Sequence, residues 1–435
     1  MNPPAVLFTI VASVFLFRLP RQWAALPLIV GASYVTLGPT VDLGPFHFTV
    51  IRILVAVGFV RIMTKGERMR GGWNVLDSLV LAWAIWAVSS SIFHKEFGEA
   101  LIFRLGLAYN AVGLYFLLRV FIQDLDDVFG ISKVLILALI PIALEMIQEE
   151  LTGKDLFSVF GGVSELSEVR GGKIRAQGPF GHSILAGTVG GVCMPMAFAL
   201  WKKNPKLAFL GLSTTTAMVI CSRSSGPIMT YIFSLFGLVL WNARAKMQLI
   251  RWTAVVGIFA LAIVMQAPIY YLLARIDLTG SSTGYHRAIL VEAAIKHFDE
   301  WWLAGTDYTL HWTPNAGFGN DTDITNHYIR LGVWGGLPLM CLFVAILVAG
   351  FVSASKALKF RTNEAVQGQF LIWALGCSLF AHIMTMMSVS YFDQSIFFLY
   401  LPLAVLGSLQ ATPKVEAEMT VDGLVDHEES LCHNS

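Results

Sequence analysis

Long apolar stretches separated by short polar connections run through most of the chain. A helix crosses the hydrocarbon core of a bilayer with about twenty apolar residues, so each stretch predicts a membrane-spanning helix. The first two stretches are short, and whether 5–18 crosses fully stays open. The pattern predicts an all-α, polytopic transmembrane helix bundle over residues 1–411, with about 12–13 spans: 5–18, 23–38, 46–63, 75–93, 98–120, 130–149, 181–201, 205–221, 225–241, 252–273, 331–352, 367–388 and 394–410.

The distribution of basic residues predicts on which side of the membrane each connection between spans lies. Cytoplasmic loops of membrane proteins retain Lys and Arg, and the connections between the other spans carry almost none. The N-terminus is therefore predicted outside and the C-terminus inside, and residues 412–435, which are acidic and lack aromatic residues, predict a disordered cytoplasmic tail. The basic connections are 18–21, 65–70, 119–133, 202–206, 244–251 and 356–361.

The amino-acid composition indicates a membrane protein rather than a soluble one. The 435 residues are 56% hydrophobic and only 14% charged, whereas a soluble domain is about one quarter charged. A net charge of +1 without a basic stripe argues against a nucleic-acid partner. The five cysteines stand singly, which indicates neither a disulfide framework nor a zinc site.

Two long polar loops, 151–180 and 274–330, are predicted on the outside and carry basic residues that an anionic ligand would explain. The second loop is expected to be partly helical. From Arg287 to Phe298 its pattern predicts an amphipathic helix whose Ile289, Ala293 and Ile295 rest on the membrane. This loop is the longest polar interval in the chain and the place where chemistry is expected.

Three outside arginines are candidate ligands for an anion. Arg175 precedes the span 181–201, whose small residues predict close packing on a neighbouring helix. Arg223 lies in a turn of small residues, and Arg287 opens the predicted amphipathic helix. A guanidinium at a membrane surface can donate two parallel hydrogen bonds to one phosphate. The alternative for each is an interfacial arginine that only anchors its helix.

His327 is the main candidate for proton transfer. Imidazole is well suited to accept a proton from a hydroxyl near neutral pH, and Asp323 would orient the ring if the segment between them is helical. A histidine that caps a helix is the alternative. His182 and His286 are weaker candidates, more often structural than catalytic.

Arg52, Arg104 and Glu145 lie away from the ends of their predicted spans, where charged residues are costly and usually face the interior of a bundle. Arg52 and Arg104 are predicted to border one outside cavity, with Glu145 as their partner, and a buried ion pair that fixes helix packing is the alternative. The second loop also contains residue types that bind metals: His297, Asp307, His311 and Asp321. Their spacing matches no known metal-binding motif, so no metal is predicted.

The order of these motifs resembles the O-antigen ligase and O-antigen polymerase superfamily of bacterial inner-membrane proteins, over residues 170–351. Arg175-x-x-Gly-x-Phe leads into a span, and Ser-Arg-Ser forms the turn at Arg223. The long loop then opens on Arg287 and closes on His327 and an aromatic residue. Leu-Gly-x-x-Gly-Gly-Leu follows in the next span.

The resemblance implies a metal-independent glycosyltransferase without a cofactor, acting at the periplasmic face on a glycan linked to undecaprenyl diphosphate. Arg175, Arg223 and Arg287 would hold the diphosphate, Arg287 and His327 would be catalytic, and His327 would be the base. The acceptor would be a sugar or lipid A-core, and a chain-length regulator or other polysaccharide-assembly proteins would be partners. The order Asn326-His327 and the short interval to Gly332 favour a polymerase over a ligase.

A membrane transporter of polysaccharides or small molecules, without glycosyltransfer, is the alternative from another class. Such a protein places polar residues near the middle of the membrane and often carries internal repeats. Here the polar residues gather toward one surface and no repeat is evident. The pattern therefore favours the enzyme.

Overall fold

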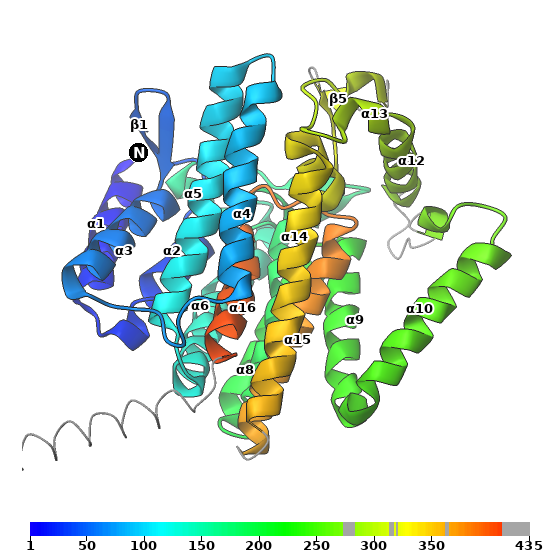
Figure 1. Cartoon of the computed structure of the whole chain (residues 1–435). Coiled ribbons are helices and arrows are strands. Elements are labelled where there is room, and N and C mark those ends of the chain that lie inside the picture. The colour runs from blue at the N-terminus through cyan, green and yellow to red at the C-terminus, as the bar shows by residue number, and fades with distance from the viewer. Residues whose placement is uncertain (273–282, 313–316, 319–320, 362–364, 411–435) are drawn as a thin grey trace, which may run out of the picture.

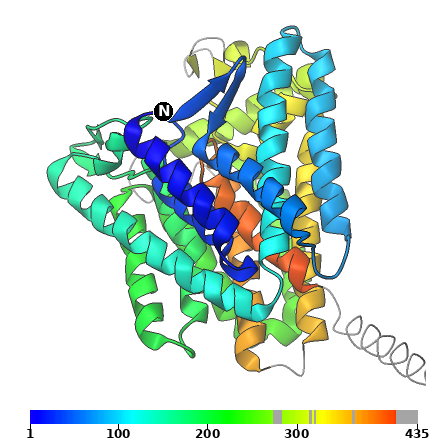
Figure 2. The same ribbon diagram turned by 90° about the vertical axis from the view of Figure 1, so that its left-hand side faces the viewer.

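The computed structural model describes residues 1–272, 283–312, 317–318, 321–361 and 365–410, and it confirms the predicted all-α helix bundle (Figures 1 and 2). The predicted tail 412–435 and part of the loop 274–330 lie outside these residues. The helices are α1 (Pro3–Arg18), α2 (Leu26–Tyr34), α3 (Val50–Lys65), α4 (Val75–Ser89), α5 (Phe97–Phe121), α6 (Leu125–Thr152), α7 (Ser183–Ala199), α8 (Pro205–Cys221), α9 (Ser225–Val239), α10 (Met247–Val264), α12 (Thr283–Lys296), α13 (Phe298–Trp301), α14 (His327–Phe360), α15 (Val366–Met386) and α16 (Ile396–Leu409).

Short elements connect these helices. Three antiparallel hairpins pair β1 with β2, β3 with β4, and β5 with β6. Their strands are β1 (Thr40–Leu43), β2 (Phe46–Thr49), β3 (Glu168–Arg170), β4 (Lys173–Arg175), β5 (Gly317–Phe318) and β6 (Asp321–Thr322). The 3₁₀ turns are η1 (Arg21–Trp23), η2 (Ser90–Phe93), η3 (Leu156–Phe160), η4 (Leu240–Lys246), η5 (Ile269–Tyr271) and η6 (Leu310–Trp312).

Several helices are long and apolar enough to cross a membrane. By length and composition there are six such stretches among the described residues: Val75–Phe93, Phe97–Phe121, Leu125–Thr152, Ser225–Val264, His327–Phe360 and Val366–Met386. The stretch Ser225–Val264 is bent, because α9 and α10 meet at a sharp angle (Figure 1). Four further apolar helices are shorter. The number of spans, about 12–13, stays a prediction.

Two of the predicted spans are revised. The stretch 23–38 contains α2, whose nine residues rise only about 14 Å, half of a bilayer core. The first residues of the stretch 46–63 form strand β2 rather than helix. Strands β1 and β2 are joined by a two-residue turn, in which Gly44 has φ +61° and Leu43 pairs with Phe46. Helix α3 therefore starts only at Val50, and Arg52 lies in its first turn.

The basic connections gather at one end of the bundle. Arg21 pairs with Asp127 at 2.7 Å, and Lys65 donates to the Phe17 carbonyl at 2.6 Å. The turn between α9 and α10 and the end of α14 lie at this same end, whereas α12, α13 and the β1–β2 hairpin lie at the other (Figure 1). The bundle thus separates its basic connections from its long polar loop, as the charge pattern predicts.

Helix α7 occupies the centre of the bundle, against α8, α9 and α15. A Cβ at Gly187 would lie 2.5 Å from Ser222 Oγ, and one at Gly190 would lie 2.8 Å from the Thr215 carbonyl oxygen. The expected close packing of small residues is therefore confirmed.

The Gly335-Gly336 pair breaks α14 near its start. Gly336 has φ +78° and ψ 178°, a conformation that is essentially restricted to glycine. The polar backbone groups around the break find partners outside the helix: Trp86 Nε1 donates to the Gly335 carbonyl at 2.7 Å, and the Leu337 N–H donates to the Trp302 carbonyl at 2.7 Å. The break explains the glycine pair of the motif and separates the turns that carry His327 from the long apolar part of α14.

Gly336→Ala is expected to destabilise the protein by about 2–4 kcal/mol, because the new Cβ would lie 2.2 Å from the Leu303 carbonyl oxygen in a backbone conformation that only glycine tolerates. Thermal unfolding of the purified protein measures the effect. Gly376→Ala in α15 is the matched control, because its Cβ would meet nothing within 4 Å. Equal midpoints for the two variants would contradict this explanation of the glycine pair.

Candidate functional site

A cavity of about 1070 Å³ opens at the end of the bundle that carries the β1–β2 hairpin. Its walls come from the hairpin, α3, α5, the start of α14 and the segment that leads into α16. Most of the lining is aromatic or aliphatic. The Arg, His, Asp and Glu residues in the lining are His47, Arg52, Glu99, His327, Arg330 and Asp393. The cavity therefore joins an apolar interior to a small group of titratable side chains.

His327 is the first residue of α14 and is 4% exposed. Its Nδ1 accepts a hydrogen bond from the Tyr391 N–H at 3.3 Å and lies 3.4 Å from Ser390 Oγ. A neutral imidazole carries its proton on one nitrogen only, so an accepting Nδ1 places the proton on Nε2. In this arrangement Nε2 is a donor, on a ring that lines the cavity.

The segment before His327 is not helical. Residues 323–326 are irregular, and Asn326 caps α14 by accepting the N–H groups of Tyr328 and Ile329 at 3.0 and 3.1 Å. The helical spacing that would have let Asp323 orient His327 is therefore absent, and Asp323 is exposed. The position of the ring is fixed instead by Ser390 and Tyr391.

Arg330 follows His327 by one helical turn and faces the same cavity. Its Nη1 donates to Ser390 Oγ at 3.0 Å, and its guanidinium lies 5.2 Å from the centre of the Trp334 ring. Sequence reasoning noted this arginine only as the end of the polar loop. Its spacing of three residues from His327 is the signal that would have singled it out.

The two arginines predicted inside spans have different environments. Arg52 lines the cavity, where it donates to Asn110 Oδ1 at 3.1 Å and to the His47 carbonyl at 2.7 Å. Arg104 is buried at 3% exposure and donates to the Trp334 carbonyl at 2.9 Å, which supports the break in α14. The prediction that both border one cavity is therefore wrong for Arg104.

Glu145 is not the partner of these arginines. Its Oε1 accepts the Leu156 N–H at 3.0 Å, and the carboxylates of Glu149 and Asp155 lie beside it. Burial, together with the charge of Glu149, raises the pKa of Asp155 to about 7. These carboxylates hold the start of the loop 151–180 against α6.

Arg175 and His182 meet at the carboxylate of Glu168. Arg175 is 4% exposed, its Nη1 lies 2.9 Å from Glu168 Oε2, and its Nε–H has no hydrogen-bond partner among the described residues. His182 caps α7 by accepting the Ile184 N–H at 3.1 Å, and its Nε2 lies 3.7 Å from Glu168. Burial lowers the pKa of His182, Arg175 lowers it further, and Glu168 and Asp323 oppose the shift.

Arg223 lies on the neighbouring turn, because the Ala176 N–H donates to the Cys221 carbonyl at 3.1 Å. Its Nε donates to Glu150 at 2.7 Å, and its backbone adopts the left-handed φ of 47°. Arg175 and Arg223 therefore lie on adjacent segments, each with a carboxylate partner.

Arg287 and His286 lie half-buried in the first turn of α12. This helix begins earlier than predicted, and Leu290 and Ala293 pack against Ile329 of α14. The expectation that Ala293 rests on the membrane is therefore wrong, although Ile295 is exposed. Helix α12 contacts η5 and η6, whereas α13 contacts α14.

Residues 388–395, between α15 and α16, join the two groups of side chains. Ser390 and Tyr391 contact His327, whereas Asp393 Oδ2 accepts the Gly181 N–H at 2.7 Å, next to His182. Burial raises the pKa of Asp393, and the hydrogen bonds from Ser395 and Gly181 oppose the shift. Sequence reasoning counted this segment only among the connections with almost no Lys or Arg. The signal it missed was a run of polar residues between two apolar spans.

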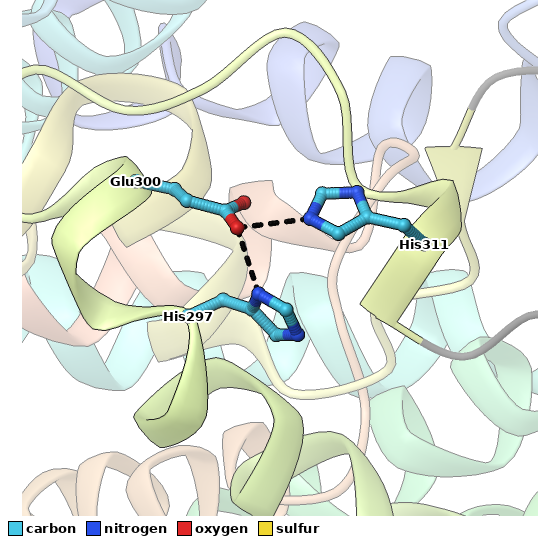
Figure 3. A group of neighbouring side chains, drawn as sticks. All are labelled: His297, Glu300 and His311. Carbon is cyan, nitrogen blue, oxygen red and sulfur yellow. Dashed lines mark hydrogen bonds and ion pairs between the residues drawn. The ribbon is translucent and has the colours of Figure 1, made fainter.

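A second cluster lies in the long polar loop, where His297, Glu300 and His311 converge (Figure 3). Glu300 Oε1 lies 2.7 Å from His297 Nδ1 and 2.9 Å from His311 Nε2. Burial alone would raise the pKa of Glu300, but hydrogen bonds from Trp312, His311 and His297 lower it to about 2. The side chain of Asp321 lies outside the described residues, and Asp307 pairs with His94 instead.

The chain is therefore an all-α protein with helices suited to a membrane and a polar site at one end of the bundle. Comparison with family models and with curated proteins finds no match.

Proposed function

We propose that the protein is a glycosyltransferase of the bacterial inner membrane that acts on a lipid-linked saccharide at the periplasmic face. One observation carries this proposal: a largely apolar cavity brings His327, Arg330 and Arg52 together at a single end of the bundle. A lipid-linked saccharide has a polyprenyl chain, an anionic diphosphate and a sugar. An apolar cavity with cationic groups in its lining matches the first two of these parts.

Arg330 and Arg52 would stabilise the diphosphate as it leaves the sugar. Negative charge develops on the leaving group in the transition state, and fixed guanidinium groups at a water-poor surface stabilise it without a metal. The resemblance adds Arg175, Arg223 and Arg287 as diphosphate ligands. The unpaired Nε–H of Arg175 supports this role, because a buried donor without a partner is costly unless a ligand supplies one.

His327 would donate a hydrogen bond from Nε2 to the diphosphate. The contact between its Nδ1 and the Tyr391 N–H favours the Nε2–H form of the neutral ring. The base role expected from the sequence needs the other tautomer and the loss of this contact. The donor role therefore agrees better with the surroundings of the ring.

The acceptor would be a sugar hydroxyl: its oxygen would bond to the sugar as the bond from the sugar to the diphosphate breaks, and its proton would pass to the leaving diphosphate. The order of residues around His327 favours a polymerase over a ligase. A polymerase extends a glycan that is still linked to the lipid carrier, whereas a ligase moves the finished glycan to lipid A-core. In either case a chain-length regulator or other polysaccharide-assembly proteins would be partners. A membrane transporter remains the second candidate, since a cavity with arginines also binds an anionic cargo without cleaving it.

Arg330→Ala is expected to abolish rescue of surface polysaccharide in cells that lack the protein, because the diphosphate would lose a cationic ligand. Gels of surface and lipid-linked glycans, with the amount of inserted protein measured in parallel, report the result. Arg287→Ala tests the resemblance in the same way. Arg251→Ala, an exposed residue of α10 that is not in the lining of the cavity, is the matched control and should rescue fully.

The glycan pattern separates the candidates. Single repeats on the acceptor with the long ladder lost indicate a polymerase, whereas long lipid-linked chains with no attached glycan indicate a ligase. Lipid-linked single repeats trapped on the cytoplasmic side would favour the transporter. Unchanged glycans in cells that lack the protein would contradict the glycosyltransferase proposal.

A further inference from the structure

We propose that His297, Glu300 and His311 form a zinc site that ties together the two ends of the segment 297–311 in the extramembrane loop. Two imidazoles and one carboxylate are ligands that Zn²⁺ prefers, and three protein ligands leave a fourth position for water. The site is distinct from the cavity at His327 and does not depend on the proposed glycosyltransfer.

The three ligand atoms converge from different elements. His297 lies between α12 and α13, Glu300 lies on α13, and His311 lies on η6, and their side chains point toward one another (Figure 3). One ligand atom from each residue lies within 4.8 Å of the other two. In tetrahedral coordination with bonds of about 2.0–2.1 Å, neighbouring ligand atoms are about 3.3–3.4 Å apart. The observed separations of 2.7 and 2.9 Å from Glu300 Oε1 thus need only small outward shifts of the side chains.

The surroundings already orient the ligands. Trp312 Nε1 donates to Glu300 Oε2 at 3.0 Å, which leaves Oε1 to face the two histidines. The His297 ring stacks on Trp312 with an interplanar angle of 9°, and the His311 ring stacks on Tyr308 with an angle of 15°. Hydrogen bonds of this kind to a ligating carboxylate set its orientation in metal sites. The preformed geometry is the reason to expect a metal rather than a chance meeting of side chains.

The position of the cluster indicates what the metal would do. Trp301 and Trp312 lie beneath it in a small apolar core that also contains Ile329 of α14, two residues after His327. A metal held by His297 and His311 would tie the two ends of the intervening segment together over this core. It would act as a clamp on the loop, because its ligands come from the two ends of this segment.

Zinc titration of the tag-free, full-length protein in detergent tests the proposal, with bound metal counted by elemental analysis. We expect one Zn²⁺ per chain. His297→Ala, His311→Ala and Glu300→Gln should each lose stoichiometric binding. Trp312→Phe keeps all three ligands and should weaken zinc affinity about 10–100-fold, an effect typical of residues that orient ligands. His47→Ala, which removes a histidine paired with Asp42 elsewhere, is the control and should still bind one Zn²⁺.

Co²⁺ provides a second readout, because its visible absorption reports nitrogen and oxygen ligands in tetrahedral geometry. Wild-type protein that takes up no zinc would overturn the proposal, and so would binding that persists in Glu300→Gln. If one of the alanine variants fails to fold, the wild-type stoichiometry and Glu300→Gln still decide the question.

Discussion

His327→Ala is expected to lower the rate of glycosyl transfer by about 10²–10³-fold, which is typical for the loss of one hydrogen-bond donor at a developing negative charge. The variant should still bind the lipid-linked donor, because Arg330 and Arg52 remain in the cavity. Turnover and donor binding of the purified protein, measured side by side, separate the two effects.

His327→Gln distinguishes the donor role from the base role. The amide nitrogen of Gln reproduces the position of Nε2 and keeps a donor there, so the donor role predicts a rate within about tenfold of wild type. A general base contributes about 10²–10⁴-fold, and Gln cannot replace it. Equal and large losses in the Ala and Gln variants would therefore restore the base role that the sequence suggested. Wild-type turnover in His327→Ala would leave His327 structural.

Asp77→Asn is expected to destabilise the bundle by about 3–5 kcal/mol, because it removes one charge of a buried ion pair. Asp77 and Arg119 have side chains 0% and 1% exposed, and Arg119 Nε lies 3.1 Å from Asp77 Oδ1. Tyr115 also donates to this carboxylate at 2.7 Å. The amide would leave the guanidinium of Arg119 buried without a counter-charge. Denaturant unfolding in detergent measures the change.

Two controls accompany this prediction. Asp126→Asn makes the same change at a side chain that is 96% exposed, 3.9 Å from Lys203, and should cost about 0–1 kcal/mol. The double variant Asp77→Asn with Arg119→Met should recover part of the loss, because the unpaired charge is removed. Stability of Asp77→Asn within about 1 kcal/mol of wild type would contradict this view of the pair.

Much of the fold followed from hydropathy alone, because a long apolar run has few alternatives to a helix. The helices lie where apolar runs were found, and the small residues of α7 pack as expected. The errors occurred where local chemistry competed with hydropathy. Gly44-Pro45 formed a hairpin turn inside an apolar region, and the stretch around α2 was apolar without being helical throughout.

The site was less predictable, because its contacts join residues far apart in the chain. His327 was found from its chemistry, but its neighbours Ser390 and Tyr391 lie more than sixty residues away and carry no charge. Likewise, the spacing of His297 and His311 matches no zinc motif. His297 and Glu300 are one helical turn apart, and only tertiary packing brings His311 of η6 to them. Sequence spacing reports ligands that share an element, whereas His311 lies on a different one.

The most direct test of the proposed function is the reaction of the purified protein, reconstituted alone in lipid vesicles, with a labelled saccharide on polyprenyl diphosphate and an acceptor glycan. The glycosyltransferase proposal predicts that the label moves to the acceptor while free polyprenyl diphosphate accumulates, and that His327→Ala slows both together. Donor that binds, or crosses the vesicle membrane, with its saccharide still attached would contradict the proposal and favour a transporter.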